Sequence, residues 1–250
     1  MKRFAVILKT EMLLFSRDFF GFFFTLVFPV MMLLLFGGIY GNEPVYDGAD
    51  MGMMDISVPA YSVMIMGVTG LMALPLTLSG YKEKNIYKRF DAAPAGKKSI
   101  IAAQVLVNLI MTLIGILVLL IVGKLVYNIQ IKGDIFGIFT GILFSAAAMF
   151  SMGFLFTAVG RDLKSTSVLC YPFYFVMMFL SGATMPDMLF PDTIKKISGL
   201  LPMTYAVDLM QGIFSGDGLS LHGKELIILG SLTVAFTVIG AFLYKRKDWT

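Results

Sequence analysis

The chain has 250 residues, of which 58% are hydrophobic and only 14% are charged, and its mean hydropathy is +0.84. A soluble domain usually carries about a quarter charged residues, so this composition excludes a water-soluble globular protein. A single Cys excludes an internal disulfide, and with a single His it leaves too few ligands for the usual zinc site. The composition predicts an integral membrane protein.

Six long runs without charged residues define the predicted topology. A membrane-spanning helix needs about 20 apolar residues, and these runs are continuously apolar, whereas barrel strands alternate. The sequence therefore predicts an all-α integral membrane fold with one transmembrane domain over residues 1–250. The predicted spans are residues 19–41, 56–80, 100–123, 135–159, 166–185 and 226–244.

The distribution of Lys and Arg predicts the orientation of these spans. With six spans both termini lie on one side, which carries fifteen basic and six acidic residues, whereas the other side carries five basic and ten acidic residues. Basic residues gather in cytoplasmic loops, so we expect a multi-pass protein of a bacterial cytoplasmic membrane with both termini in the cytoplasm. The net charge of +4 then reflects topology, and we expect no nucleic-acid partner.

Residues 2–17 are predicted to form an amphipathic helix in the cytoplasmic membrane interface, with lipid as its partner. Phe4, Leu8, Met12 and Phe15 recur at helical spacing on one face. The alternative is that the first span begins early, and the charged residues between positions 11 and 18 argue against it.

The cytoplasmic loop 82–98 has two interpretations. Glu83–Asp91 can form a short helix with Ile86, Tyr87 and Phe90 on one side, before Pro94 breaks it. Apolar side chains in a charged loop favour a docking surface for a partner. The alternative is an anchor whose apolar residues enter the lipid headgroups.

The extracellular stretch 187–223 is largely apolar, but its charged residues divide it into pieces too short to span a membrane. We expect one or two short re-entrant helices here, between spans five and six. An ordinary surface loop resting on the membrane is the alternative.

The spans contain no ionisable residue that would couple transport to protons or sodium. Gly218–Glu225 resembles a phosphate-binding loop, but Glu225 occupies the position that needs Ser or Thr. We therefore expect no catalytic, cofactor-binding or metal-binding residue in this chain, and energy from a partner.

Two segments of the chain carry distinctive motifs. The first is Leu180–Phe214, with a Ser-Gly pair, a Pro-containing turn, an amphipathic segment and the stretch Leu-Pro-Met-Thr-Tyr at 201–205. The second is Lys82-Glu83-Lys84, followed by Arg89 and Ala93-Pro94. Together with six spans and this loop layout, these segments resemble the membrane subunits of type-2 ABC exporters, the ABC-2 type transporter family, and the resemblance covers essentially the whole chain.

The resemblance implies a permease that dimerises with a second copy or a paralogue and binds cytoplasmic ABC ATPase subunits, which hold ATP and magnesium. It assigns ATPase coupling to Glu83, Ile86, Tyr87 and Phe90. It assigns the outer gate, or re-entrant motif, to Ser181, Gly182, Pro186, Pro202 and Tyr205.

The predicted cargo is an amphipathic, antibiotic-like small molecule, because the spans offer Phe and Met but no charged groups. Export of a polysaccharide or lipid-linked glycan is the alternative within this class. An ATP-independent channel, or a membrane-embedded immunity or assembly factor, is the alternative outside it.

Overall fold

A computed structural model of the chain describes residues 2–44, 51–87, 96–185 and 190–246. These residues are helical apart from turns and a single β-bridge between Pro44 and Gly52. Six helical stretches are long and apolar enough to cross a membrane, which confirms the predicted all-α fold with six spans. Span one consists of α2 (Phe19–Phe22), the π-helix η1 (Phe23–Val27) and α3 (Phe28–Tyr40), and span two consists of α4 (Met53–Gly67), the π-helix η2 (Val68–Ala73) and α5 (Leu74–Glu83). Spans three to six are α7 (Gly96–Tyr127), α8 (Ile135–Val159), α9 (Leu163–Leu180) and α12 (Gly223–Arg246).

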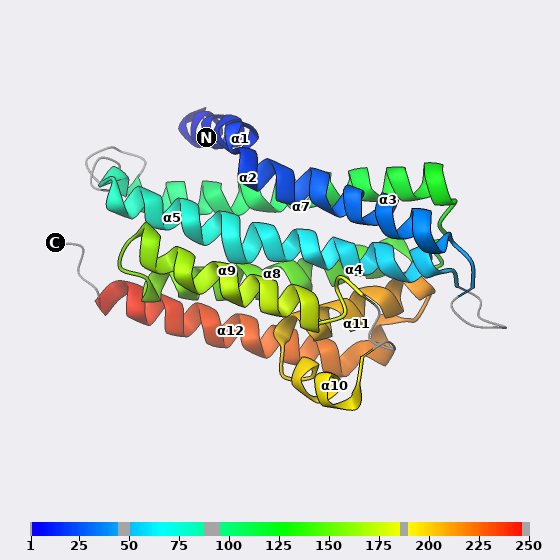
Figure 1. The fold of residues 1–250 in the computed structure, drawn as a ribbon. Coiled ribbons are helices and arrows are strands. Elements are labelled where there is room, and N and C mark those ends of the chain that lie inside the picture. The colour runs from blue at the N-terminus through cyan, green and yellow to red at the C-terminus, as the bar shows by residue number, and fades with distance from the viewer. Residues whose placement is uncertain (1, 45–50, 88–95, 186–189, 247–250) are drawn as a thin grey trace.

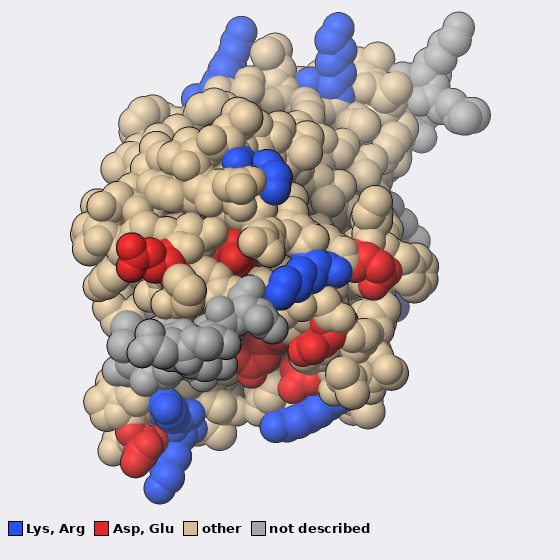
Figure 2. Space-filling view, turned by 90° about the vertical axis from the view of Figure 1, so that its right-hand side faces the viewer, with Lys and Arg blue, Asp and Glu red and all other residues tan. Residues whose placement is uncertain are grey.

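The spans run side by side and share two common ends (Figure 1). One end holds the last turn of α12, the end of α5 and the turn between α8 and α9. We call it the inner end, after the orientation that the charge pattern predicts, and the opposite end the outer end. Figure 2 looks onto the outer end, where acidic and basic side chains are scattered over a mostly uncharged surface.

Helix α1 (Lys2–Arg17) lies crosswise to the spans, which run across the view of Figure 1 while α1 is seen nearly end-on. Its buried and half-buried face carries Phe4, Leu8, Met12 and Phe15, the four residues that the helical spacing predicts. This face packs on α7. Glu11 lies on the same face, although the sequence places it among the charges that keep α1 out of the membrane.

Span two is the centre of the bundle, because 83% of its most apolar stretch is buried. It packs against spans one, three, four and five and against helix α11. Its closest contact is with span four, where a Cβ atom added to Gly153 would lie 1.9 Å from the carbonyl oxygen of Gly70. Glycine is therefore required at this crossing, since any side chain would force the two spans apart.

Both π-helical segments precede a proline. Pro29 and Pro75 have no N–H, so the carbonyls four residues earlier, on Thr25 and Leu71, lose their α-helical partner. Both carbonyls lie inside the π segments, where the bonding pattern shifts to a wider turn. The two prolines thus give a physical reason for the local widening of spans one and two.

The stretch 187–223 contains α10 (Asp192–Ser198), α11 (Pro202–Ser215) and the 3₁₀-helix η4 (Leu219–His222). Helix α11 packs against spans two, four and six, with Met203, Leu209 and Ile213 fully buried. Short helices are therefore present where the sequence predicts them, and their depth in a membrane stays a prediction.

Candidate functional site

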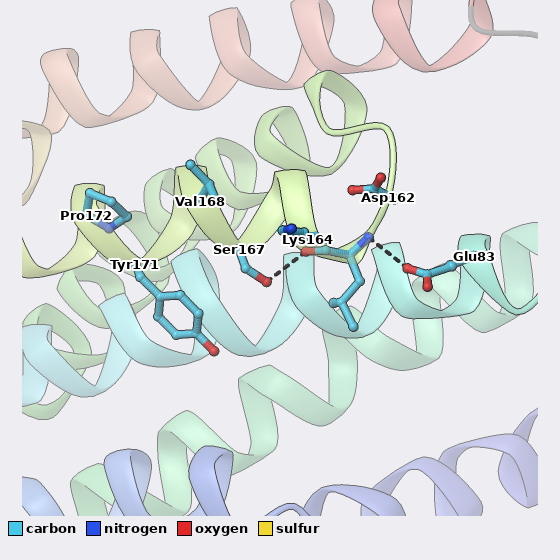
Figure 3. Close-up of a pocket in the computed structure, with 8 residues that line it drawn as sticks. Glu83, Asp162, Lys164, Ser167, Val168, Tyr171 and Pro172 are labelled. Atoms are coloured by element: carbon cyan, nitrogen blue, oxygen red, sulfur yellow. Dashed lines mark hydrogen bonds between the residues drawn. The ribbon is translucent and has the colours of Figure 1, made fainter.

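The inner end of the bundle contains a cavity of about 790 Å³ beside spans two and five (Figure 3). Charged side chains lie at one end of it, and an apolar wall continues along α9. Its lining consists of Glu83, Asp162, Leu163, Lys164, Ser167, Val168, Tyr171 and Pro172. This volume falls within the range of about 300–1,000 Å³ that is typical of sites for small molecules.

Glu83 joins spans two and five at this cavity. It is the last residue of α5, and its Oε2 accepts a hydrogen bond from the backbone N–H of Leu163, the first residue of α9, at 3.0 Å. The first N–H groups of a helix have no partner within the helix and carry partial positive charge, so a carboxylate there is stabilising. The structure thus places this predicted coupling residue at the inner end, bonded within its own chain.

Asp162 is the second carboxylate at the start of α9, and the sequence analysis did not single it out. It is the N-cap of the helix, and its Oδ1 accepts a hydrogen bond from the backbone N–H of Ser165 at 2.7 Å. The hydrogen bonds from Ser165 hold the pKa of Asp162 below its ordinary value. An Asp three residues before a Ser, at the start of an apolar run, is a recognisable N-cap signal.

The other predicted coupling residues occupy different environments. Ile86 is half-buried and packs on the core of the bundle. Tyr87 is only 5% exposed, and its hydroxyl donates a hydrogen bond to the carbonyl of Leu78 at 3.1 Å. Burial raises the pKa of Tyr87 above its ordinary value. Phe90 lies outside the described residues, so Glu83 and Ile86 are the predicted coupling residues that reach the surface here.

The residues of the predicted outer gate lie on two elements. Ser181 and Gly182 follow the last residue of α9, so span five ends at Leu180 and not at the predicted 185. Gly182 has φ of +80°, a left-handed conformation that stops the helix and favours glycine. Ser181 is buried, and Pro186 lies outside the described residues.

Pro202 and Tyr205 belong to the first turn of α11. Pro202 is the first residue of this helix, where a missing N–H costs nothing. The hydroxyl of Tyr205 donates to the carbonyl of Gly199 at 2.7 Å. The ammonium group of Lys224, on α12, lies 5.7 Å from the centre of the Tyr205 ring. Tyr205 thus connects α11 with the turn before it and with span six.

A row of buried polar side chains along α7, which we call the polar file, is the feature that the sequence analysis missed. Gln104, Asn108 and Thr112 recur every four residues along α7, and all three are buried. The hydroxyl of Thr112 lies 2.7 Å from that of Thr69 in η2. At the inner end the file reaches Glu11. The spacing of four residues was the available signal, because it places polar groups on one face of an apolar helix.

Within the described part of the chain, no three Asp, Glu, His or Cys side chains are placed to hold a metal ion. Several polar side chains instead connect helices. These connections are Glu83 with α9, Glu11 with α5 and α7, and Tyr205 with α12.

The chain is similar in sequence to proteins that are named as transporters. The chain is 26% identical over 208 residues to ABC transporter G family member 20 of Dictyostelium discoideum, which covers 82% of this chain but 28% of that protein. It is 24% identical over 233 residues to a protein of Porphyra purpurea named as transport permease ycf38, covering 87% of this chain and 79% of the relative. A protein of the same name from Pyropia yezoensis is 24% identical over 193 residues, covering 75% of this chain and 65% of the relative.

A protein-family model matches most of the chain. The family model described as ABC-2 type transporter matches residues 2–215, which include α1, the first five spans and α11. Six apolar helices agree with a multi-pass membrane protein. The chain belongs to the ABC-2 type transporter family.

Proposed function

We propose that this chain is the permease subunit of an ATP-driven exporter of amphipathic small molecules. Two copies, or one copy and a paralogue, form the pathway, and separate cytoplasmic subunits bind ATP and magnesium. The membrane is a bacterial cytoplasmic membrane, with both termini of the chain in the cytoplasm. The excess of Lys and Arg at the inner end supports this orientation.

The cavity beside Glu83 is the observation that carries the proposed cargo. One end offers the charged groups of Glu83, Asp162 and Lys164, while Val168, Tyr171 and Pro172 form an apolar wall. A molecule with one polar and one apolar end matches both parts of this lining. A long glycan would need a row of hydrogen-bonding groups, and the α9 side of the cavity supplies few of them.

The same cavity supports a dimer. Its lining comes only from the end of α5 and from the start of α9 with its N-cap residue, so it is open on one side. A second copy that packs along α9 would close it and double the apolar wall. Most of α9 is free for such a contact, since only 28% of its apolar stretch is buried within one chain.

Coupling to the ATPase is proposed for Glu83 and Ile86. Glu83 is exposed and bonded to the start of α9, while the hydroxyl of Ser79, one turn earlier, lies 2.8 Å from that of Thr166. A push on the end of α5 would therefore reach spans two and five together. Tyr87 is buried, so in this proposal it anchors the chain after α5 against the bundle.

The test is a mild-detergent purification of the tagged chain from its native host, with identification of co-purified proteins and an assay of ATP hydrolysis. A stoichiometric partner with an ATP-binding cassette supports the proposal. Purification of the chain alone, even after cross-linking, overturns it in favour of a channel or an assembly factor.

The cargo is tested in inside-out membrane vesicles. ATP-dependent accumulation of a fluorescent amphipathic dye is expected, and Glu83→Ala with Ile86→Ala should abolish it without loss of folded protein. The matched control is Ile39→Ala, at an exposed position near the outer end of span one. Accumulation of a labelled lipid-linked oligosaccharide and not of the dye would overturn the proposed cargo.

A further inference from the structure

Glu11 is a buried carboxylate that comes from outside the spans. It belongs to α1, the helix that lies crosswise to the bundle, and it is only 6% exposed. The nearest apolar neighbours on its own face are Leu8, Met12 and Phe15, which pack on α7. These apolar contacts would hold α1 against the bundle without any charged group, so the carboxylate requires its own explanation.

Two spans donate hydrogen bonds to the same oxygen of Glu11. The hydroxyl of Tyr81 in α5 donates to Oε2 at 2.5 Å, and the side-chain amide of Gln104 in α7 also donates to Oε2. The amide of Gln104 lies 3.3 Å from the Tyr81 hydroxyl as well. We call these three residues the Glu11 triad. It is the point where α1, span two and span three meet through polar contacts.

The triad fixes position in a way that apolar packing does not. Apolar contacts tolerate a small slide or rotation of α1, because their energy depends on area and not on direction. Hydrogen bonds weaken steeply with distance and angle, so both bonds to Oε2 form in one placement only. Buried polar groups that lose a partner are costly, and a slide of α1 would remove the acceptor of the Tyr81 hydroxyl and leave the Gln104 amide with only its longer bond to Tyr81.

The triad is also close to polar contacts that reach span five and the centre of span two. Tyr81 lies two residues before Glu83, which binds the first N–H of α9. Gln104 begins the polar file of α7, which reaches η2 through Thr112 and Thr69. A path of helix backbone and hydrogen-bonded side chains therefore runs from α1 to spans two, three and five.

We infer that Glu11 is a positioning residue that fastens α1 to spans two and three, so that a push of the ATPase on the end of α5 moves α1 and both spans together. This inference rests on the proposed function, since it needs an ATPase that acts on the end of α5. It assigns to one carboxylate the task of passing a displacement of span two on to α1 and span three.

The test uses the complete complex with its ATPase, in lipid nanodiscs, and needs no cargo. Cys170 is replaced by Ala, and spin labels are attached in pairs at exposed positions. The inner pair, Val6 and Leu117, reports α1 against span three, and the outer pair, Leu125 and Leu221, reports span three against the start of span six. Distances are measured without nucleotide and after trapping with ATP and vanadate.

In the unmodified background we expect a constant inner distance and a shifted outer distance on trapping. Glu11→Ala should broaden the inner distance and remove most of the outer shift, whereas Glu11→Gln, which keeps one acceptor oxygen, should restore much of it. Gln104→Leu removes one donor without altering α1 and should act in the same direction as Glu11→Ala. Thr140→Ala removes an exposed hydroxyl from α8 and is the matched control.

The outcomes separate the two proposals. If no ATPase remains with the unmodified chain, or trapping leaves its outer distance unchanged, the proposed function fails and the inference fails with it. If trapping shifts the outer pair equally in the unmodified chain, Glu11→Ala and Gln104→Leu, the proposed function stands and the role of Glu11 is overturned.

Discussion

The side-chain amide of Asn42 donates a hydrogen bond to the carboxylate of Asp55, 3.1 Å away, and so joins the outer ends of spans one and two. The same carboxylate accepts the backbone N–H groups of Gly52 at 2.8 Å and Gln130 at 2.9 Å. Asp55 is 4% exposed, and its three donors lie just after span one, just before span two and in the loop after span three. The outer ends of the first three spans are therefore held by one buried carboxylate, as the inner ends of spans two and five are held by Glu83.

Replacing Asp55 by Ala should destabilise the fold. The change removes the acceptor of all three donors, although Asn42 keeps a hydrogen bond to the carbonyl of Tyr127 at 3.3 Å. Losing the partner of a buried donor such as the N–H of Gly52 costs about 1–3 kcal/mol, so we expect a loss of about that size. Asp55→Asn keeps one acceptor oxygen and should lose less. The measurement is thermal unfolding in detergent, followed with a fluorogenic thiol reagent that reacts with Cys170, which is fully buried in the fold. Glu43→Ala, at an exposed position in the same region, should leave the midpoint unchanged.

Gly182→Ala tests the end of span five. The residue has φ of +80°, and a side chain in the left-handed region costs about 1–2 kcal/mol. The variant should unfold at a lower temperature and loosen the stretch that leads to α10. Gly38→Ala is the matched control, because an added Cβ there meets nothing within 4 Å. Equal melting temperatures for the two variants would contradict the role of Gly182.

Tyr171→Ala tests the apolar wall of the cavity. The ring lines the cavity and is 41% exposed, so its loss removes apolar contact area from a bound amphipathic dye. Truncating such a contact should cost about 1.4 kcal/mol, which is about tenfold in dye affinity. The measurement is a fluorescence titration of the purified complex. Phe139→Ala, an exposed aromatic position on α8, should bind the dye as the unmodified chain does, and a tenfold loss there too would locate the dye elsewhere.

The Glu11 triad should make the docking of α1 depend on pH. Burial raises the pKa of Glu11 above 4.5, although the hydrogen bonds from Tyr81 and Gln104 act in the opposite direction. A carboxyl whose pKa is raised by docking binds its proton more tightly in the docked state. The proton-linked part of the docking free energy is therefore complete below about pH 4.5 and is lost as the pH rises through the raised pKa, while the hydrogen bonds to Oε2 remain.

The inner label pair, Val6 and Leu117, measures this effect without the ATPase. We expect its distance distribution to broaden as the pH rises, and the Glu11→Gln variant to show no such transition. The titratable groups that face Glu11 are Tyr81 on α5 and Tyr87 beyond it, whereas α7 offers the uncharged Gln104. A transition that persists in Glu11→Gln would assign the pH dependence to another group.

Much of this fold could be predicted because hydrocarbon excludes charge. The six spans and the buried face of α1 follow from long apolar runs and helical spacing, both of which are local properties of the sequence. The place of Glu11 could not be predicted in this way. Its burial depends on two donors that lie about 70 and 93 positions further along the chain, and a carboxylate in an amphipathic helix is ordinarily a solvent-facing residue.

At the predicted site too, local sequence features could be predicted, whereas the packing around them could not. Glu83 was predicted because the charged turn Lys82-Glu83-Lys84 before a proline resembles that of the family, and the structure adds its bond to Leu163. Tyr87 was expected on a surface, but it turns inward after Asn85, which has φ of +53°. An aromatic residue in a charged loop fits either environment, and only the packing of the bundle decides between them.

The two π-helical segments affect how relatives of this chain should be aligned. A π turn holds one residue more than the α-helix around it, and removing that residue rotates the following turns by about 100° relative to the preceding ones. A relative without Pro29 or Pro75 has no need of the extra residue. A one-residue gap within 23–27 or 68–73 of an alignment would then preserve the faces of the span on both sides. Gap penalties that forbid deletions inside membrane helices would shift every later residue of such a relative onto the wrong face.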